Sequence, residues 1–178
     1  MKRYAALLRG INVSGKNKIA MPELRKMFYN INLTEVSTLQ NSGNVLFSSD
    51  LDDRGQISRQ IRDGIFAAFG LDVPVYVTEI EHLREILSHA PGWWGTRDKG
   101  TYHNLIFILT DETPEAVSHL IGEPSEGWEQ VMPSDDVIFW SFDLGHYQKC
   151  NWWKRTASAG IAEKLTIRTA NTIRRLCI

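Results

Sequence analysis

Residues 9–19 of the chain, RGINVSGKNKI, carry the residue types of a phosphate-binding loop. They match seven of the eight positions of the template G-x-x-x-x-G-K-[ST], with Asn17 at the position of the usual Ser or Thr. In a nucleotide-hydrolysing loop the lysine reaches the phosphates, and the hydroxyl group binds Mg²⁺ at the first turn of a helix. The residue types therefore raise the question of nucleotide binding.

The surrounding sequence argues against nucleotide hydrolysis. Met21-Pro22-Glu23 is typical of a helix start, so the helix begins several residues beyond Lys16. Asn17 offers an amide where Mg²⁺ needs a hydroxyl group, and nucleotide-hydrolysing loops lie in parallel sheets. Two interpretations remain: a plain connection made flexible by glycine, or a loop whose backbone N–H groups, with Arg9 and Lys16, hold an anion without a metal.

Other catalytic and metal-binding patterns are missing. The sequence has no G-x-S-x-G, and its histidines show neither H-x-x-x-H nor H-E-x-x-H spacing. His146 and Cys150 lie four residues apart, but no second pair would complete a zinc site. The paired acids Asp111-Glu112 and Asp135-Asp136 fall where helix caps and turns explain them. We expect no metal and no cofactor, and the residues leave open whether the protein is an enzyme.

The elements that must position these residues form a βαββαβ order in the first half. Residues 4–8 read as a strand, and Leu24, Met27, Phe28 and Ile31 recur with helical spacing. EVSTLQNSGNVLFSS then predicts two strands around the turn at residues 41–44, because Gly and Asn tolerate the positive φ of tight turns. A helix with Ile57, Ile61, Ile65 and Phe69 ends at Gly70, and residues 73–77 form a strand.

The second half repeats this order. After a helix over 79–89, the sequence predicts a strand over 105–109, a helix from Thr113 to Gly122, a hairpin in WEQVMPSDDVIFWSF, a helix in NWWKRTASAGIAEKL, a strand in KLTIR and a short last helix. The fold class predicted is α+β, with two ferredoxin-like subdomains related by internal duplication, over residues 1–78 and 79–178, each an antiparallel sheet with helices on one face. A single continuous sheet is the alternative.

Composition and charge describe an ordinary globular chain of 178 residues, 43% hydrophobic and 23% charged, with a net charge of −1. Without a membrane span or signal peptide, we expect a cytoplasmic protein, and the two cysteines fit a reducing compartment. The charge is uneven: residues 1–30 and 146–178 each hold seven Lys and Arg against one acid, whereas 111–143 hold nine acids and no Lys or Arg. The basic ends either form an anion site together or are solvated faces.

Aromatic residues do not favour RNA recognition. The βαββαβ fold is also that of RNA-recognition domains, which need stacking rings on the third strand, and GNVLFSS offers only Phe47. We expect the pairs Trp93-Trp94 and Trp152-Trp153 to cover core edges or an interface. Nucleic acid and membrane are therefore not expected partners, and a homodimer is one alternative.

LLRGINVSGKNKIAMPEL followed by LQNSGNVLFSS resembles an uncharacterised bacterial family, domain of unknown function 1697. The resemblance implies two ferredoxin-like units and a segment T-x-R-N-x-N-T near the end, and it implies no reaction. The matching segment, TIRTANT (166–172), keeps Thr166, Arg168, Asn171 and Thr172 but has Thr169 and Ala170 at two positions where the family differs.

From these residues we predict one basic groove, formed by the loop 9–18 and the segment 166–172, that binds a small molecule carrying phosphate or carboxylate. The predicted ligand-binding residues are Arg9, Asn12, Lys16, Asn41, Ser42, Asn44, Arg168 and Asn171. The alternatives are a small phosphohydrolase or phosphotransferase and a protein-interaction or homodimerisation module that uses the Trp-rich surfaces.

Overall fold

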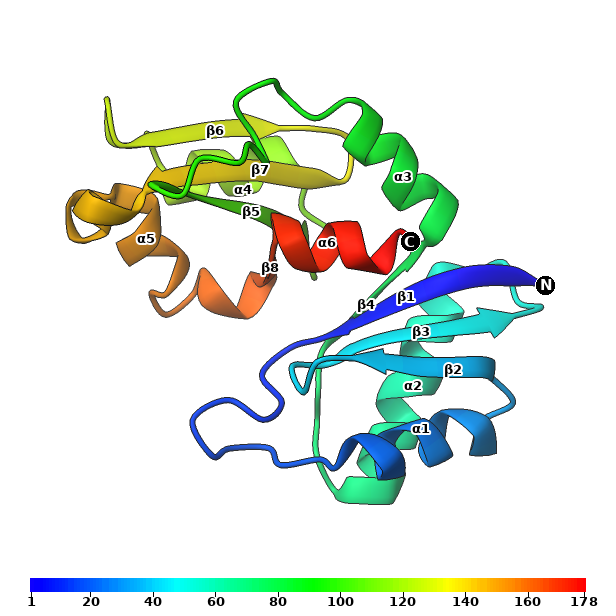
Figure 1. The fold of residues 1–178 in the computed structure, drawn as a ribbon. Helices are drawn as coiled ribbons and strands as arrows, with labels where there is room; N and C mark the ends of the chain where they lie inside the picture. The colour runs from blue at the N-terminus through cyan, green and yellow to red at the C-terminus, as the bar shows by residue number, and fades with distance from the viewer. The chain divides into compact units, whose positions relative to one another are not determined.

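Two similar sets of strands and helices appear in the computed structural model, which describes residues 1–178 (Figure 1). The chain divides into one unit of Met1–Ile86 with Cys177 and another of Leu87–Leu176 with Ile178. Each unit has one four-stranded antiparallel sheet, so the α+β class is confirmed. No helix has the length and apolar character that crossing a membrane requires.

The first unit has the predicted order of elements. In chain order these are β1 (Lys2–Leu8), α1 (Met21–Asn30), β2 (Thr34–Leu39), β3 (Asn44–Ser49), α2 (Arg54–Phe69) and β4 (Val75–Glu79), followed by α3 (Ile80–Ser88), which spans the division between the units. The strands lie in the order β2-β3-β1-β4, with Leu7 opposite Asn44 and Leu8 opposite Val75.

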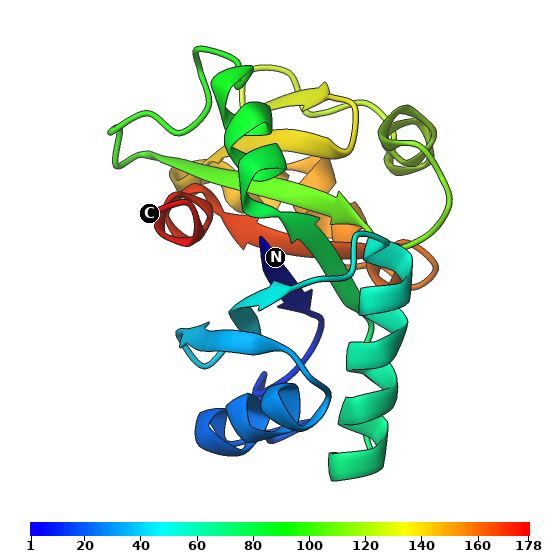
Figure 2. The ribbon, with the colours of Figure 1, turned by 90° about the vertical axis from the view of Figure 1, so that its right-hand side faces the viewer.

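Helices α1 and α2 cover one face of this sheet, as Figures 1 and 2 show. Their apolar stripes, including Leu24, Phe28 and Ile61, pack on Tyr4 and Phe47 of the sheet, and all of these side chains are fully buried. Local signals set the ends of α2. The Asp53 carboxylate accepts a hydrogen bond from the N–H of Gln56, and Gly70 closes the helix in the left-handed region.

The second unit repeats the strand order. Its elements are β5 (Thr101–Ile108), α4 (Pro114–Ile121), β6 (Glu129–Pro133), β7 (Val137–Asp143), the 3₁₀ helix η1 (Leu144–Lys149), α5 (Asn151–Thr156), the 3₁₀ helix η2 (Ala162–Lys164), β8 (Leu165–Thr169) and α6 (Ala170–Leu176). The strands lie in the order β6-β7-β5-β8. The α4 cap is as predicted, with the Thr113 hydroxyl accepting from the N–H of Ala116.

Both faces of the second sheet are covered. Val117 of α4 and Trp152 of α5 pack on Ile106 and Trp140 on one face. On the other face, Trp94 packs edge-on against Phe139, with ring centroids 5.2 Å apart. Alternation along β7 separates these two sets, because successive side chains of a strand point to opposite faces.

The helix predicted in NWWKRTASAGIAEKL is wrong in length. Helix α5 ends at Thr156, and only the short η2 precedes β8. The Ser158 hydroxyl donates to the carbonyl of Arg155, and Gly160 has a φ of +83°, which a continuing right-handed helix does not allow. Strand β5 also begins earlier than predicted, at Thr101, because β7 pairs with it from Thr101 onward although its first residues are polar.

Candidate functional site: a basic cleft in the first unit

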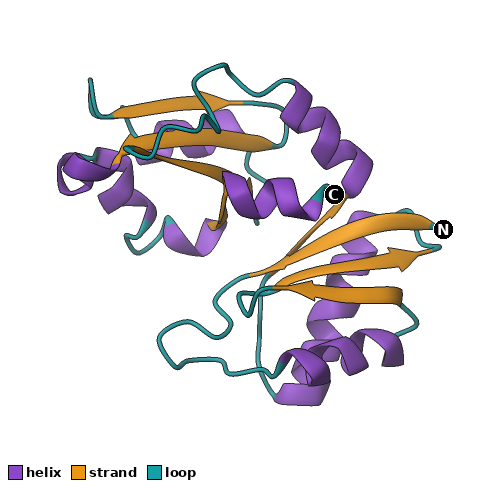
Figure 3. Ribbon diagram, viewed as in Figure 1, coloured by secondary structure: helices purple, strands orange, loops and turns teal.

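The phosphate-loop look-alike is a hairpin tip. Figure 3 shows the connection between β1 and α1 as a long loop that leaves the sheet. At its tip the N–H of Lys16 donates to the carbonyl of Val13 over 2.9 Å. The two central residues, Ser14 and Gly15, have φ of +49° and +76°. Positive φ at both positions is the pattern of a type I′ turn, so the glycine serves a turn and not a phosphate.

Two asparagines close the base of this loop. The Asn12 amide donates to the carbonyls of Ile19 and Asn41, each over 2.9 Å, while its oxygen accepts from the N–H of Ile19. The Asn17 amide donates to the carbonyl of Gly10 over 3.0 Å. The residue at the template's hydroxyl position is therefore part of the loop's own hydrogen bonding.

The turn between β2 and β3 is hydrogen-bonded to the base of this loop. The buried Asn44 amide donates to the carbonyl of Leu39 and to the Ser42 hydroxyl. Gly43 accepts from the N–H of Leu8, and a Cβ there would lie 2.8 Å from the Cβ of Leu8. Only glycine fits this position, because its φ of +78° and the close approach both exclude a side chain.

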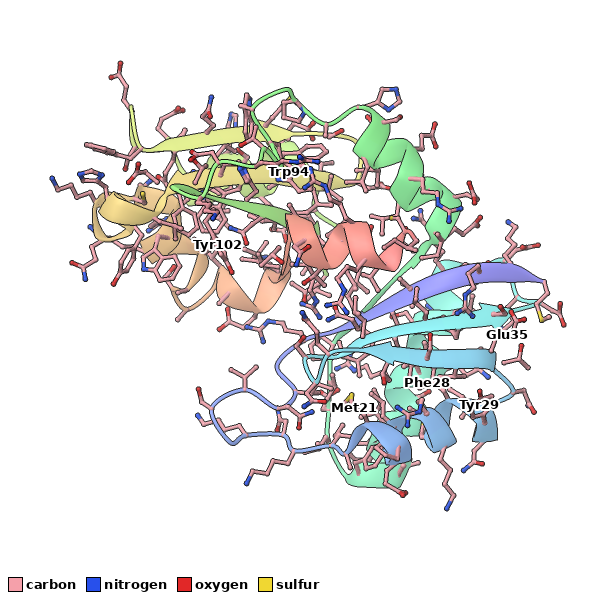
Figure 4. The ribbon with its side chains drawn as sticks, viewed as in Figure 1. Met21, Phe28, Tyr29, Glu35, Trp94 and Tyr102 are labelled. Carbon is pink, nitrogen blue, oxygen red and sulfur yellow. The ribbon has the colours of Figure 1, made fainter.

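These two loops and the start of α1 enclose an open cleft of about 500 Å³. The residues that line it are Asn12, Gly15, Lys18, Ile19, Ala20, Met21 and Asn41. Figure 4 labels Met21 at the beginning of α1. Lys18 is the only charged residue of the lining.

The electrostatics of the cleft favour an anion. Lys16 and Lys18 are exposed, and neither forms an ion pair or a side-chain hydrogen bond. The start of α1 has no side-chain cap, so the positive end of the helix adds to the charge of Lys18. Two residues of the same first turn reduce this effect: Pro22 has no N–H to donate, and Glu23 is negatively charged.

The structure distributes the eight predicted residues over several places. Asn12 and Asn41 line the cleft, while Ser42 and Asn44 hold the turn beside it. Arg9 and Lys16 belong to the same loop but are not part of the lining. Lys18, Ile19, Ala20 and Met21 were missed as lining residues. The position of Lys18, between the loop and the start of the helix, could have indicated that it lines the cleft. The phosphate-loop template instead assigns the phosphate contact to Lys16.

Arg168 and Asn171 lie in the second unit. The Arg168 guanidinium donates to the Thr166 hydroxyl over 2.8 Å and to the carbonyl of Ile167 over 3.0 Å. Burial lowers the pKa of Arg168 to about 10, so it still carries its charge at neutral pH. Asn171 is exposed in the first turn of α6.

A buried histidine–serine pair in the second unit has the geometry of a hydrogen-bonded dyad but no access to a substrate. His103 Nδ1 lies 2.6 Å from the Ser141 hydroxyl, and its Nε2 lies 3.1 Å from that of Thr96. Both side chains are buried, with exposed fractions of 8% for His103 and 1% for Ser141. Their neighbouring strands bring them together at opposite register positions, so the pair is a cross-strand contact in the sheet.

Comparison with protein families gives a match to the protein of unknown function family DUF1697 over residues 1–139. The chain belongs to the DUF1697 family. The matched segment includes the whole cleft and its supporting turn, so the cleft is formed by residues that the family description covers.

A solved structure agrees with this assignment. The DUF1697 chain is similar to a conserved bacterial protein from Streptococcus pneumoniae, with 28% identity and a TM-score of 0.85 over 99% of this chain and 97% of that one. No match is found among curated proteins. The function is therefore uncharacterised, and neither comparison supplies a reaction.

Proposed function

We propose that the first unit binds a small molecule carrying a phosphate or carboxylate group, in the cleft lined by Asn12, Lys18 and Met21. The observation that carries this proposal is an unpaired lysine inside a cleft that has no acidic lining. An unpaired ammonium group on the edge of a cleft attracts an anion and forms charge-assisted hydrogen bonds with it.

The lining suggests how the rest of the molecule would be held. Met21 is partly exposed and offers apolar surface to a ligand, whereas the Ile19 side chain is buried in the core. The cleft has the volume of a small-molecule site. A ligand would place its anionic group at Lys18 and an apolar part against Met21. The Asn12 amide has its two donors occupied by carbonyls and acts by fixing the loop.

Arg168 and Asn171, which the sequence names as ligand-binding residues, remain predictions. So do the ferredoxin-like description of each unit, its origin by duplication, the division at residues 78 and 79, and cytoplasmic residence. The identical strand orders of the two sheets support the duplication, because order 2-3-1-4 in both units follows from a repeated βαββαβ sequence.

The experiment is a thermal-shift screen followed by calorimetric titration, with inorganic phosphate, nucleoside monophosphates, sugar phosphates and simple carboxylates. We expect at least one anion to bind, and Lys18→Ala to weaken it about tenfold or more, because hydrogen bonds to charged groups contribute about 1.5–3 kcal/mol. Lys26→Ala, an equally exposed lysine of α1 outside the lining, is the matched control and should bind as the wild type does.

A second variant tests the charge of the loop 9–18. Arg9→Ala combined with Lys16→Ala should weaken binding if the loop charge as a whole contributes. No response of the wild type to any anion, or equal binding by Lys18→Ala, would exclude the proposed function.

A further inference from the structure

Three aromatic side chains and one leucine lie partly exposed on the second unit, and we call them the aromatic patch: Tyr102, Leu144, Tyr147 and Trp153. Their exposed fractions are 40%, 42%, 37% and 43%. Large apolar side chains that are exposed together mark binding surfaces more often than chance, whereas single ones need no explanation. Figure 4 labels Tyr102 on this unit.

One buried ring holds the patch together. The Tyr102 ring packs against Phe142 with centroids 5.4 Å apart, and the Trp153 ring packs against the same Phe142 at 5.4 Å. Tyr147 then packs edge-on against Trp153 at 5.1 Å. Because Phe142 is almost fully buried in β7, rings from β5, η1 and α5 are fixed on one rigid support.

Cations accompany these rings along the chain. The segment HYQKCNWWKR (146–155) contains both aromatic and basic residues, and its Lys149 and Lys154 are both exposed. Lys149 lies over the ring of Trp128, 5.7 Å from its centroid, and Lys154 directly follows Trp153. Neither Lys149 nor Lys154 forms an ion pair, whereas Asp98 accepts hydrogen bonds from Gly100 and Thr101 and Asp143 contacts His146.

We propose that the aromatic patch binds single-stranded nucleic acid. Unpaired bases would stack on Trp153, Tyr147 and Tyr102, and the phosphates would lie against Lys149 and Lys154. Rigid rings beside uncompensated lysines are the combination that such strands need, because every base has a π-face and every nucleotide carries one negative charge.

The aromatic patch differs from the binding site of an RNA-recognition domain, which needs stacking rings on its third strand. The corresponding strand of the first unit, β3, offers only Phe47, which is fully buried in the core. The aromatic patch instead lies where β5 begins and β7 ends, continued by η1 and α5. The proposal is therefore independent of the cleft in the first unit.

The test is fluorescence anisotropy of a labelled oligothymidylate of about 12 nucleotides, longer than many single-domain sites, with oligouridylate as the RNA arm. We expect binding by the full chain that weakens as salt rises. Trp153→Ala should weaken it about five- to a hundredfold, since stacking contributes about 1–3 kcal/mol per base. Lys154→Glu, which leaves the rings in place, should also weaken it.

Controls separate stacking from simple charge attraction. Lys26→Glu reverses the charge of an exposed lysine of the first unit that lies outside the cleft, and it should leave oligonucleotide binding unchanged. Circular dichroism must show that the Trp153→Ala variant remains folded. If this variant is unfolded, the Lys154→Glu variant tests the proposal in its place. Absence of binding at about 10⁻⁴ M protein, equal affinity for a duplex, or equal displacement by polyglutamate would each overturn the proposal.

Discussion

At the scale of single residues, asparagine does in this chain what the phosphate-loop template assigns to other groups. Asn12 and Asn17 adopt positive φ, at +53° and +48°. Their side-chain amides donate hydrogen bonds to the carbonyls of Ile19 and Gly10 in the same loop. Asparagine suits both tasks, because its short amide bonds to nearby backbone and stabilises the left-handed region. The match to the template is therefore explained by loop geometry, and Lys18, not Lys16, is the lysine that lines the cleft.

His103 makes stability depend on pH. Burial lowers its pKa, the charge of Arg174 lowers it further, and Asp98 opposes both. Below about pH 6.5 the unfolded chain takes up a proton that folded His103 resists, so the free energy of unfolding falls as the pH falls. We expect urea unfolding at about pH 5.5 to occur at lower urea than at about pH 7.5.

The His103→Gln variant should lose part of this difference, even if it is less stable at both pH values. His89→Gln changes an exposed histidine whose side chain forms no hydrogen bond or ion pair. This variant should keep the wild-type difference in stability between the two pH values. A full wild-type pH difference in His103→Gln would show that other groups cause it.

At the scale of elements, a distant side chain replaces a missing cap. Helix α5 has Cys150 at its N-cap, with no side-chain hydrogen bond. The buried Glu129 carboxylate of β6 accepts instead from the N–H of Trp152, at 3.1 and 3.2 Å, and from the N–H of Ser125 at 2.9 Å. It also accepts from the Trp140 indole at 3.3 Å. One carboxylate therefore ties β6, β7 and α5 together beneath the aromatic patch.

Glu129→Gln should lower the free energy of unfolding by about 1–3 kcal/mol, because one acceptor oxygen becomes an amide nitrogen that faces donors in the core. Urea denaturation followed by circular dichroism measures this change. Glu126→Gln makes the same substitution at an exposed residue nearby and should change stability by less than about 0.5 kcal/mol. Equal midpoints for the two variants would mean that the carboxylate contributes nothing as an acceptor.

At the scale of the whole molecule, the first unit has a core of its own. Its buried cluster runs from Tyr4 to Val77 and includes residues of α1, α2 and all four strands of its sheet. The second unit has a separate cluster from Ile106 to Leu165. A core contributed by one continuous segment is the property that lets a segment of under a hundred residues fold independently.

Residues 1–86 expressed alone should therefore unfold cooperatively on heating, at a lower temperature than the full chain. Circular dichroism in the far and near ultraviolet measures both secondary structure and side-chain packing. Retained far-ultraviolet signal with gradual melting and no near-ultraviolet signal would identify a loosely packed state and contradict the prediction.

Local signals made much of the fold predictable. The helical spacing of Leu24, Met27 and Phe28 placed α1, and Thr113 with Gly122 marked both ends of α4. Asn and Gly between apolar runs placed the turn between β2 and β3. These signals act between residues close in sequence, so they can be read without knowing the fold.

The sequence by itself determined the order of elements, the family resemblance and the basic character of the loop 9–18. Only the tertiary structure decided that Lys18 lines the cleft and Lys16 does not, that β5 starts at Thr101, and that the exposed rings of Tyr102 and Trp153 both pack on Phe142. Each of these depends on contacts between residues far apart in the chain. Periodicity and turn chemistry carry no information on such contacts, because they describe only neighbours along the sequence.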